Sequence, residues 1–137
     1  MVGSEVWIMT EYIALWQGVA ANRRFELDEV LDSSGGLRLQ LSDDAGREVV
    51  ILFASHLCYR RMDEGDALSD LADLTASAGT GKVFYEVRNS EFLAWFHGQS
   101  QGLYLDRSLQ HFGIYTSNDM IDVIAFGAPS VQADTQA

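Results

Sequence analysis

The sequence predicts an α+β fold in which a mostly antiparallel sheet of about five to seven strands carries two helices packed on one face. Three observations predict it: apolar and polar residues alternate through much of the chain, turn sequences separate these segments, and two later stretches have helical spacing. The expected order is strands, helix, strand, helix and hairpin. This order is typical of α+β proteins, whose helices gather on one side of an antiparallel sheet.

A period of two predicts the first strands. Phe25, Leu27 and Leu31 alternate with acidic residues, which indicates a half-buried strand with an acidic outer face. The preceding segment, residues 7–19, suits a helix or a strand, and its type stays open. Three further strands are expected at residues 37–41, 49–53 and 57–62; the second of these is apolar throughout, as in a strand covered on both faces.

An acidic helix is expected next. Asp63 caps its N-terminus in this interpretation, and Asp66 acts as a short capping-box partner. Asp63, Asp66, Asp70 and Asp73 recur every three or four residues, so that one helix face carries four carboxylates. Leucines on the opposite face pack on the sheet, which turns the carboxylates towards solvent.

A strand at residues 83–87 and a short aromatic helix follow. Asn89 or Ser90 caps this helix, which carries Phe92, Trp95 and Phe96. We expect these aromatic side chains to be buried between the sheet and the N-terminal segment. The alternative is that Trp95 stays partly exposed and joins a binding surface.

The chain ends in an expected hairpin and tail. Strands at residues 112–116 and 121–126 flank a turn in which Asn118 and Asp119 are expected in left-handed conformations. The single proline, Pro129, introduces a polar segment. We therefore expect one globular domain over residues 1–129 and a flexible tail over residues 130–137.

Charge narrows the class of partner. The sequence holds 20 Asp and Glu against 9 Lys and Arg, for a formal net charge of −11. Nucleic acids and anionic membranes are bound through clustered basic residues, so neither is an expected partner, whereas such a field attracts basic proteins. The apolar runs are shorter than the roughly 20 residues of a membrane-spanning helix. A single cysteine and the lack of a signal-peptide pattern predict a cytoplasmic protein.

No set of residues in the sequence names a reaction. Cys58 and His56 share a strand face at a spacing too wide for a good thiol–base contact, so an inert core thiol is expected. His56, Cys58, His97 and His111 lack the paired spacing typical of zinc ligands, and whether they converge stays open. We expect a non-enzymatic protein with no catalytic residue, metal or cofactor.

The sequence favours a protein-binding module whose acidic face docks on a basic partner, such as a bacterial toxin. In size, single-domain build and charge the chain resembles the immunity proteins that neutralise bacterial toxins. This resemblance rests on general properties and carries no residues over. The expected partner-binding residues are Asp63, Asp66, Asp70, Asp73, Glu26, Asp28, Glu29, Asp32 and Trp95.

Two alternatives stay open. The first is a small enzyme or ligand-binding domain with a pocket between sheet and helices, lined either by His56, Cys58 and Tyr59 or by His111 and Tyr115. The second is a subunit of a larger assembly that uses the aromatic helix as its contact. The sequence leaves the oligomeric state open.

Overall fold

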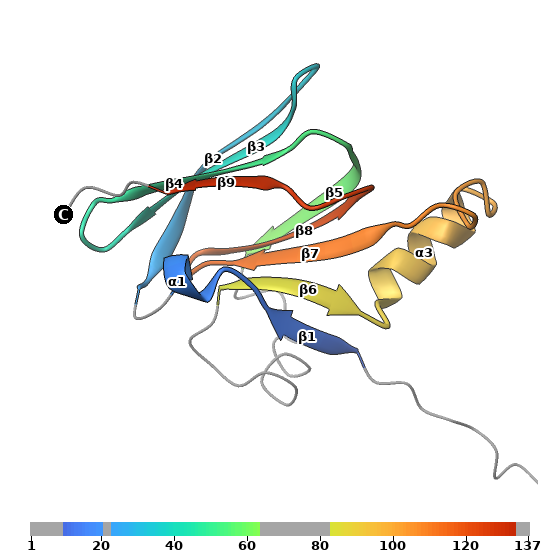
Figure 1. The fold of residues 1–137 in the computed structure, drawn as a ribbon, viewed down its shortest axis with the longest axis horizontal. Helices are drawn as coiled ribbons and strands as arrows, with labels where there is room; N and C mark the ends of the chain where they lie inside the picture. The colour runs from blue at the N-terminus through green and yellow to red at the C-terminus, as the bar shows by residue number, and fades with distance from the viewer. Residues whose placement is uncertain (1–9, 21–22, 64–82, 134–137) are drawn as a thin grey trace, which may run out of the picture.

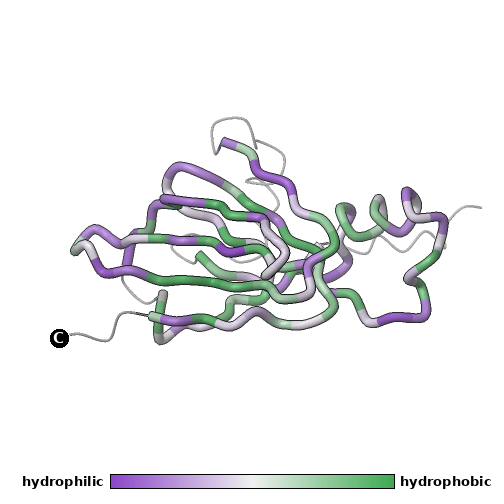
Figure 2. Tube along the Cα trace, turned by 90° about the horizontal axis from the view of Figure 1, so that it is seen from above, coloured by the Kyte–Doolittle hydropathy of each residue, from purple (hydrophilic) through white to green (hydrophobic). Residues whose placement is uncertain are grey.

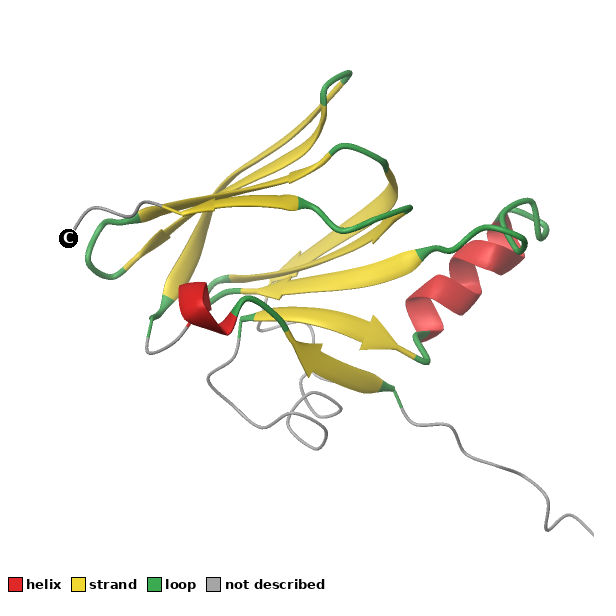
Figure 3. Cartoon of the chain, in the orientation of Figure 1, coloured by secondary structure: helices red, strands yellow, loops and turns green. Residues whose placement is uncertain are grey.

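The computed structural model describes residues 10–20, 23–63 and 83–133, which form two antiparallel sheets with little helix (Figures 1 and 3). The five-stranded sheet has the order β1-β6-β7-β8-β5, and the four-stranded sheet has the order β2-β3-β4-β9. The prediction of mostly antiparallel strands is confirmed. The prediction of a single sheet is wrong, because the described strands divide between two sheets. Of the two predicted helices, the aromatic one is present as a nine-residue helix and the acidic one falls outside the described residues.

The described chain begins in the five-stranded sheet, forms three strands of the four-stranded sheet, returns for four strands of the five-stranded sheet, and ends with a strand in the four-stranded sheet. The open N-terminal segment contains both types of structure, a strand followed by a short helix. A two-residue turn after β4 carries the chain into β5 of the five-stranded sheet. The strands are β1 (Glu11–Ala14), β2 (Phe25–Ser33), β3 (Gly36–Asp43), β4 (Glu48–Phe53), β5 (His56–Asp63), β6 (Phe84–Arg88), β7 (Gln110–Tyr115), β8 (Asp119–Ala125) and β9 (Ser130–Ala133); the helices are α1 (Gln17–Ala20) and α3 (Glu91–Gln99).

The main hydrophobic core lies between the two sheets. Alternate residues of both sheets are buried in it, among them Leu39, Ile51, Phe112 and Ile121. Figure 2 shows the hydrophobic residues along the strands and mostly hydrophilic residues at the turns. Because side chains alternate along a strand, the other face of the five-stranded sheet remains available for polar groups.

A β-bulge in β2 changes which of its side chains face the core, so the predicted alternation is wrong for the second half of the strand. The pairing of β2 with β3 shifts register between Leu27 and Glu29, so that Val30, rather than Leu31, packs against the core. Leu31 is 48% exposed. One extra residue in a strand reverses the phase of every side chain after it, and the regular alternation in the sequence concealed this.

The expected left-handed turn at Asn118 is wrong. Among described non-glycine residues, positive φ angles occur at Trp16, Asn89 and Gln101. The side chain of Asn118 instead ties the hairpin to β2, accepting a hydrogen bond from the backbone N–H of Leu27 at 3.1 Å and donating to the carbonyl of Leu27 at 3.4 Å. Asparagine therefore serves here as a bridge between the sheets.

Two other expectations also change. Ser130–Ala133, placed by composition in a flexible tail, forms β9 and pairs with β4. Asp63, expected to cap a helix, is the last residue of β5 and pairs with Asp119 in β8. The acidic helix predicted after Asp63, including Asp66, Asp70 and Asp73, lies outside the described residues.

A buried carboxylate organises the turn after β3. Asp43 accepts hydrogen bonds from the Nε atoms of Arg23 at 2.7 Å and Arg47 at 3.0 Å, and from the backbone N–H groups of Ala45 and Arg47. Burial raises the pKa of Asp43, but the hydrogen bonds to backbone and arginine outweigh burial and lower the pKa from 3.8 to about 2. The ionised form therefore stabilises the fold.

This pKa predicts a contribution to acid unfolding. Because the pKa of Asp43 is lower in the folded state than in the unfolded chain, its contribution is present above about pH 4 and is lost as the pH falls towards about 2. Asp43→Asn should lower the urea midpoint at neutral pH and flatten its decline over this window. Asp44→Asn, an exposed neighbour, is the matched control and should leave the decline unchanged. Equal pH profiles for Asp43→Asn and wild type would contradict the assignment.

Candidate functional site

Strand register places a row of functional side chains on the outer face of the five-stranded sheet. Arg60 pairs with Asp122, and Asp122 pairs with Gly113. His111 and Tyr115 lie two residues to either side of Gly113 on β7. All five therefore share the face that points away from the four-stranded sheet.

The carboxylate of Asp122 lies at the centre of this row. Its Oδ1 atom is 2.7 Å from Nε2 of His111 and accepts a hydrogen bond from the hydroxyl of Tyr115 at 2.6 Å. Its Oδ2 atom accepts a hydrogen bond from Nε of Arg60 at 3.1 Å. On the other side of the imidazole, Nδ1 of His111 is 2.6 Å from Oγ of Ser90.

These partners decide the charge of Asp122. Burial raises the pKa of this carboxyl group, but the hydrogen bonds from His111 and Tyr115 and the nearby charge of Arg60 act in the opposite direction and outweigh burial. The pKa of Asp122 therefore lies below its ordinary value, and the side chain is a buried carboxylate. A buried charge of this kind persists because its oxygens are hydrogen-bonded.

Ser90 joins the network to helix α3. It is the N-cap of α3, one of the two residues that the sequence predicted for this position, and its Oγ accepts a hydrogen bond from the backbone N–H of Leu93 at 3.0 Å. Asn89, directly before it, has a φ angle of 53° and turns the chain sharply from β6 into the helix. The ring of Phe92 then packs edge-on against His111, with centroids 5.3 Å apart.

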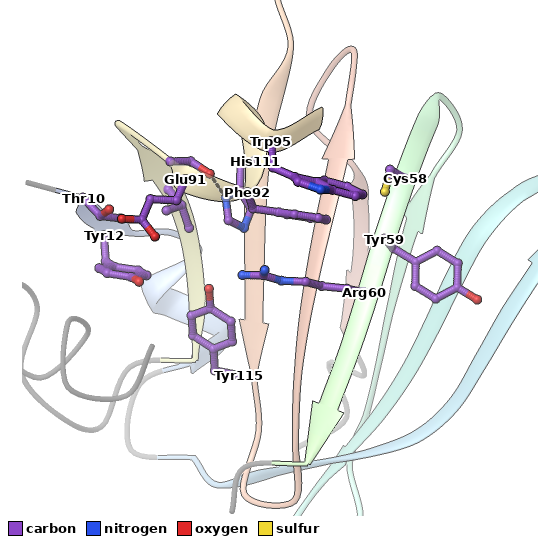
Figure 4. A pocket seen from close by; sticks show the side chains of 12 residues that line it. Thr10, Tyr12, Cys58, Tyr59, Arg60, Glu91, Phe92, Trp95, His111 and Tyr115 are labelled. Atoms are coloured by element: carbon purple, nitrogen blue, oxygen red, sulfur yellow. Dashed lines mark hydrogen bonds between the residues drawn. The ribbon is translucent and has the colours of Figure 1, made fainter. Parts of the chain in front are cut away.

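A pocket of about 440 Å³ opens over this network, between α3 and the sheet (Figure 4). On one side Trp95 stacks on Phe92 with ring centroids 5.8 Å apart, and the guanidinium carbon of Arg60 lies 4.2 Å from the centroid of Phe92. Tyr12 and Tyr115 lie on the other side, their ring centroids 6.3 Å apart. Flat aromatic walls and a small number of polar groups are typical of small-molecule sites.

Part of this pocket was predicted from the sequence. Cys58, Tyr59, His111 and Tyr115 all belong to its lining, although the side chain of Tyr59 points away from the others in Figure 4. His56 is not part of the lining; its Nε2 is 2.9 Å from a carboxylate oxygen of Asp32. The alternatives of the sequence analysis thus merge into one site.

Two aromatic and thiol predictions can be compared with the structure. Trp95 is 52% exposed, so the expected deep burial of the aromatic helix is wrong for this residue, and the alternative of an exposed Trp95 is confirmed. Burial raises the pKa of the Cys58 thiol, partly offset by the charge of Arg60. Cys58 therefore favours its neutral form, but it is half-buried and lines the pocket, so its predicted position in the core is wrong and its inertness stays a prediction.

The predicted acidic face divides between separate elements. Glu26, Asp28, Glu29 and Asp32 are all exposed on β2, an edge strand of the four-stranded sheet. Asp63 is exposed on β5, in the other sheet. Because β2 and β5 belong to different sheets, strand pairing does not join Asp63 and the four carboxylates of β2 into one acidic surface.

The zinc-site question has a structural answer. Within residues 10–20, 23–63 and 83–133, no three His, Cys, Asp or Glu side chains are arranged to hold a metal ion. His56 and His111 contact different carboxylates, and His97 lies near the end of α3.

In the described part of the chain, no helix combines the length and apolar character needed to cross a membrane.

Three residues of the network were missed: Arg60, Ser90 in its contact with His111, and Asp122. They lie on separate strands and at a helix start, far apart in the sequence. The alternation of the hairpin strands places His111 and Asp122 on the same face, but only the strand register brings them close together.

Comparison with known proteins finds no family model, no curated protein and no solved structure that matches this chain.

Gly113 allows Tyr115 to reach Asp122. A Cβ atom at position 113 would overlap the Cζ and hydroxyl oxygen of Tyr115, whose ring lies over the glycine. Gly113→Ala should therefore displace the ring, break its hydrogen bond to Asp122 and cost about 1–3 kcal/mol in the free energy of unfolding.

A double-mutant cycle in urea checks this prediction. Tyr115→Ala removes the overlapping ring, so adding Gly113→Ala to it should cost much less than Gly113→Ala alone. Additive costs would show that the two residues do not conflict.

Proposed function

We propose that this protein is a binding module whose pocket takes up a planar ligand carrying an anionic group. The observation that supports the proposal is the position of Arg60, the one Lys or Arg side chain among the described residues that line the pocket. The Arg60 side chain is 41% exposed, while its Nε atom is anchored on Asp122. A guanidinium group held in this way presents its planar edge in a fixed orientation, which suits a carboxylate or phosphate.

The walls of the pocket support a flat ligand. Trp95, Phe92 and the guanidinium of Arg60 are layered on one side in Figure 4, and Tyr12 and Tyr115 lie on the other. An aromatic ring bound beside such surfaces is removed from water without losing hydrogen bonds. Because Phe92 and Asp122 hold Arg60 from two directions, little side-chain ordering is left to accompany binding.

Benzoate is a simple probe of this chemistry, and benzamide is its neutral analogue. We expect benzoate to bind in the millimolar range and to quench Trp95 fluorescence, and we expect benzamide to bind about tenfold more weakly or worse. NMR titration of the Trp95 indole signal measures both affinities. Equal affinities for benzoate and benzamide would exclude recognition of the charge.

Arg60 and Arg61 provide a matched pair of variants. Arg60→Met should weaken benzoate binding about tenfold or more, since a hydrogen bond to a charged group is lost. Arg61→Met removes the same charge from the next residue of β5, where the arginine pairs with Asp119 at 2.8 Å and does not line the pocket. Equal losses in both variants would indicate a general charge effect and contradict a role of Arg60 in recognition.

A second candidate function is the docking of a basic protein partner. Toxins of the kind that immunity proteins neutralise are examples of such a partner. The observation that favours it is the exposure of four carboxylates on one edge strand, β2. A localised acidic field speeds encounter with a basic protein. The same charges also protect an edge strand from pairing with another chain.

The charges of β2 can be tested without changing the core. Replacing Glu26, Asp28 and Glu29 by their amides should slow association with a basic partner at low salt, and the difference should shrink as salt is added. A control triple of Asp44, Glu48 and Asp106 removes equal charge at other exposed positions. Pull-down from the native host supplies the partner, and stopped-flow association rates supply the comparison. If the two triple variants associate at the same rate, the edge strand has no special role.

A further inference from the structure

The floor of the pocket contains a hydroxyl, an imidazole and a carboxylate joined in series. Oγ of Ser90 is 2.6 Å from Nδ1 of His111, and Nε2 of His111 is 2.7 Å from Oδ1 of Asp122. All three residues are buried, and both Ser90 and His111 belong to the pocket lining. A nucleophile that is hydrogen-bonded to a base, with the base oriented by a third group, is the arrangement that activates a serine.

The protons of this series can be placed by counting donors. Asp122 is a carboxylate and only accepts, so His111 carries a proton on Nε2 and donates it to Oδ1. In the neutral imidazole, Nδ1 is then an acceptor facing Ser90. The Ser90 hydroxyl accepts from the backbone N–H of Leu93, and with His111 in this neutral form, which a general base requires, it donates its own proton to Nδ1. The roles of the two imidazole nitrogens are interchanged relative to the serine proteases, while the order of the groups is the same.

The backbone around Ser90 also suits a nucleophile. Strand β6, the left-handed Asn89 and helix α3 form a sharp strand–turn–helix with Ser90 at the start of the helix. In the nucleophile elbow of many hydrolases the serine itself occupies the strained turn, whereas here Asn89 takes that conformation and Ser90 is extended. The N–H groups of Glu91 and Phe92, in the first turn, have no acceptor within the helix. Such N–H groups and the helix dipole stabilise negative charge that develops beside them.

We propose that Ser90 is a catalytic nucleophile for acyl transfer from small esters bound in the pocket, with His111 as general base and Asp122 as the residue that positions His111. The inference goes beyond the proposed binding function and does not depend on which ligand is bound. It also departs from the expectation of a non-enzymatic protein, because the contact between Ser90 and His111 joins residues that are far apart in the sequence.

The reaction balances without a cofactor. Oγ of Ser90 attacks the ester carbonyl carbon, and its proton passes to Nδ1 of His111. The tetrahedral intermediate collapses, the ester C–O bond breaks, and the alcohol leaves with the proton from Nδ1. Water then attacks the acyl group on Ser90, giving a proton to Nδ1, and the acid is released as Ser90 recovers the proton. The carboxylate formed lies in the pocket that contains Arg60.

A fluorophosphonate probe tests the nucleophile directly. The folded protein should gain the mass of one adduct, mapped to Ser90 by peptide mass spectrometry, and should hydrolyse p-nitrophenyl acetate. Ser90→Asp keeps an N-cap acceptor for α3 and removes the nucleophile, so it should fold and show neither property. His111→Gln should react about a hundredfold more slowly or worse, because the general base is lost.

Each outcome of the labelling experiment either supports or overturns the assignment of Ser90 as a nucleophile. Labelling of Ser90 that is lost in Ser90→Asp and slowed in His111→Gln supports a catalytic serine. No labelling of the folded protein, labelling at another residue, or an unchanged rate in His111→Gln overturns it and leaves Ser90 as a helix cap. Benzoate binding is measured on the same samples: if it survives when ester chemistry is absent, the inference fails while the binding function stands.

Discussion

The buried carboxylate of Asp122 is the interaction on which the site depends. It draws donors from two other strands: Arg60 on β5, and His111 and Tyr115 on β7. Each donor is positioned by a charge-assisted hydrogen bond, which is stronger and more directional than a neutral one. Loss of Asp122 would leave the buried Nε2 of His111 without this partner, at a cost of about 1–3 kcal/mol in the free energy of unfolding.

The contacts form a closed ring rather than a line. Asp122 holds His111, His111 contacts Ser90, and Ser90 caps helix α3. The helix places Phe92, whose ring lies against the guanidinium of Arg60, and Arg60 returns to Asp122. Each member is thus restrained from two sides. A ring of this kind orders the pocket before any ligand arrives, so the cost of ordering belongs to folding rather than to binding.

The sequence predicted local structure better than the relations between elements. A period of two indicated most strands, and the N-cap of α3 was predicted to be Asn89 or Ser90 because capping depends on neighbouring residues. The division into two sheets was missed, since it depends on which strands pair across long separations. Leu31 was assigned to the wrong face because a bulge adds one residue without any mark in the sequence. Only part of the site was predicted. His111 and Tyr115 share a strand, so their common face follows from the sequence, whereas Arg60 and Asp122 come next to them only through the register of strand pairing.

The acidic edge and the pocket are joined by one contact. Asp32 of β2 lies 2.9 Å from His56 at the start of β5, the strand that carries Cys58 and Arg60 into the pocket. A contact of this kind transmits a signal only if some element between the sites has two arrangements that both sites bias. Strand β5 pairs with β8 at His56 and, after a register shift, from Cys58 to Asp63, and Arg60 is fixed by Asp122 within that second stretch. Displacing β5 would break the ladder and the buried ion pair together, so a partner on β2 and a ligand in the pocket should bind independently of each other.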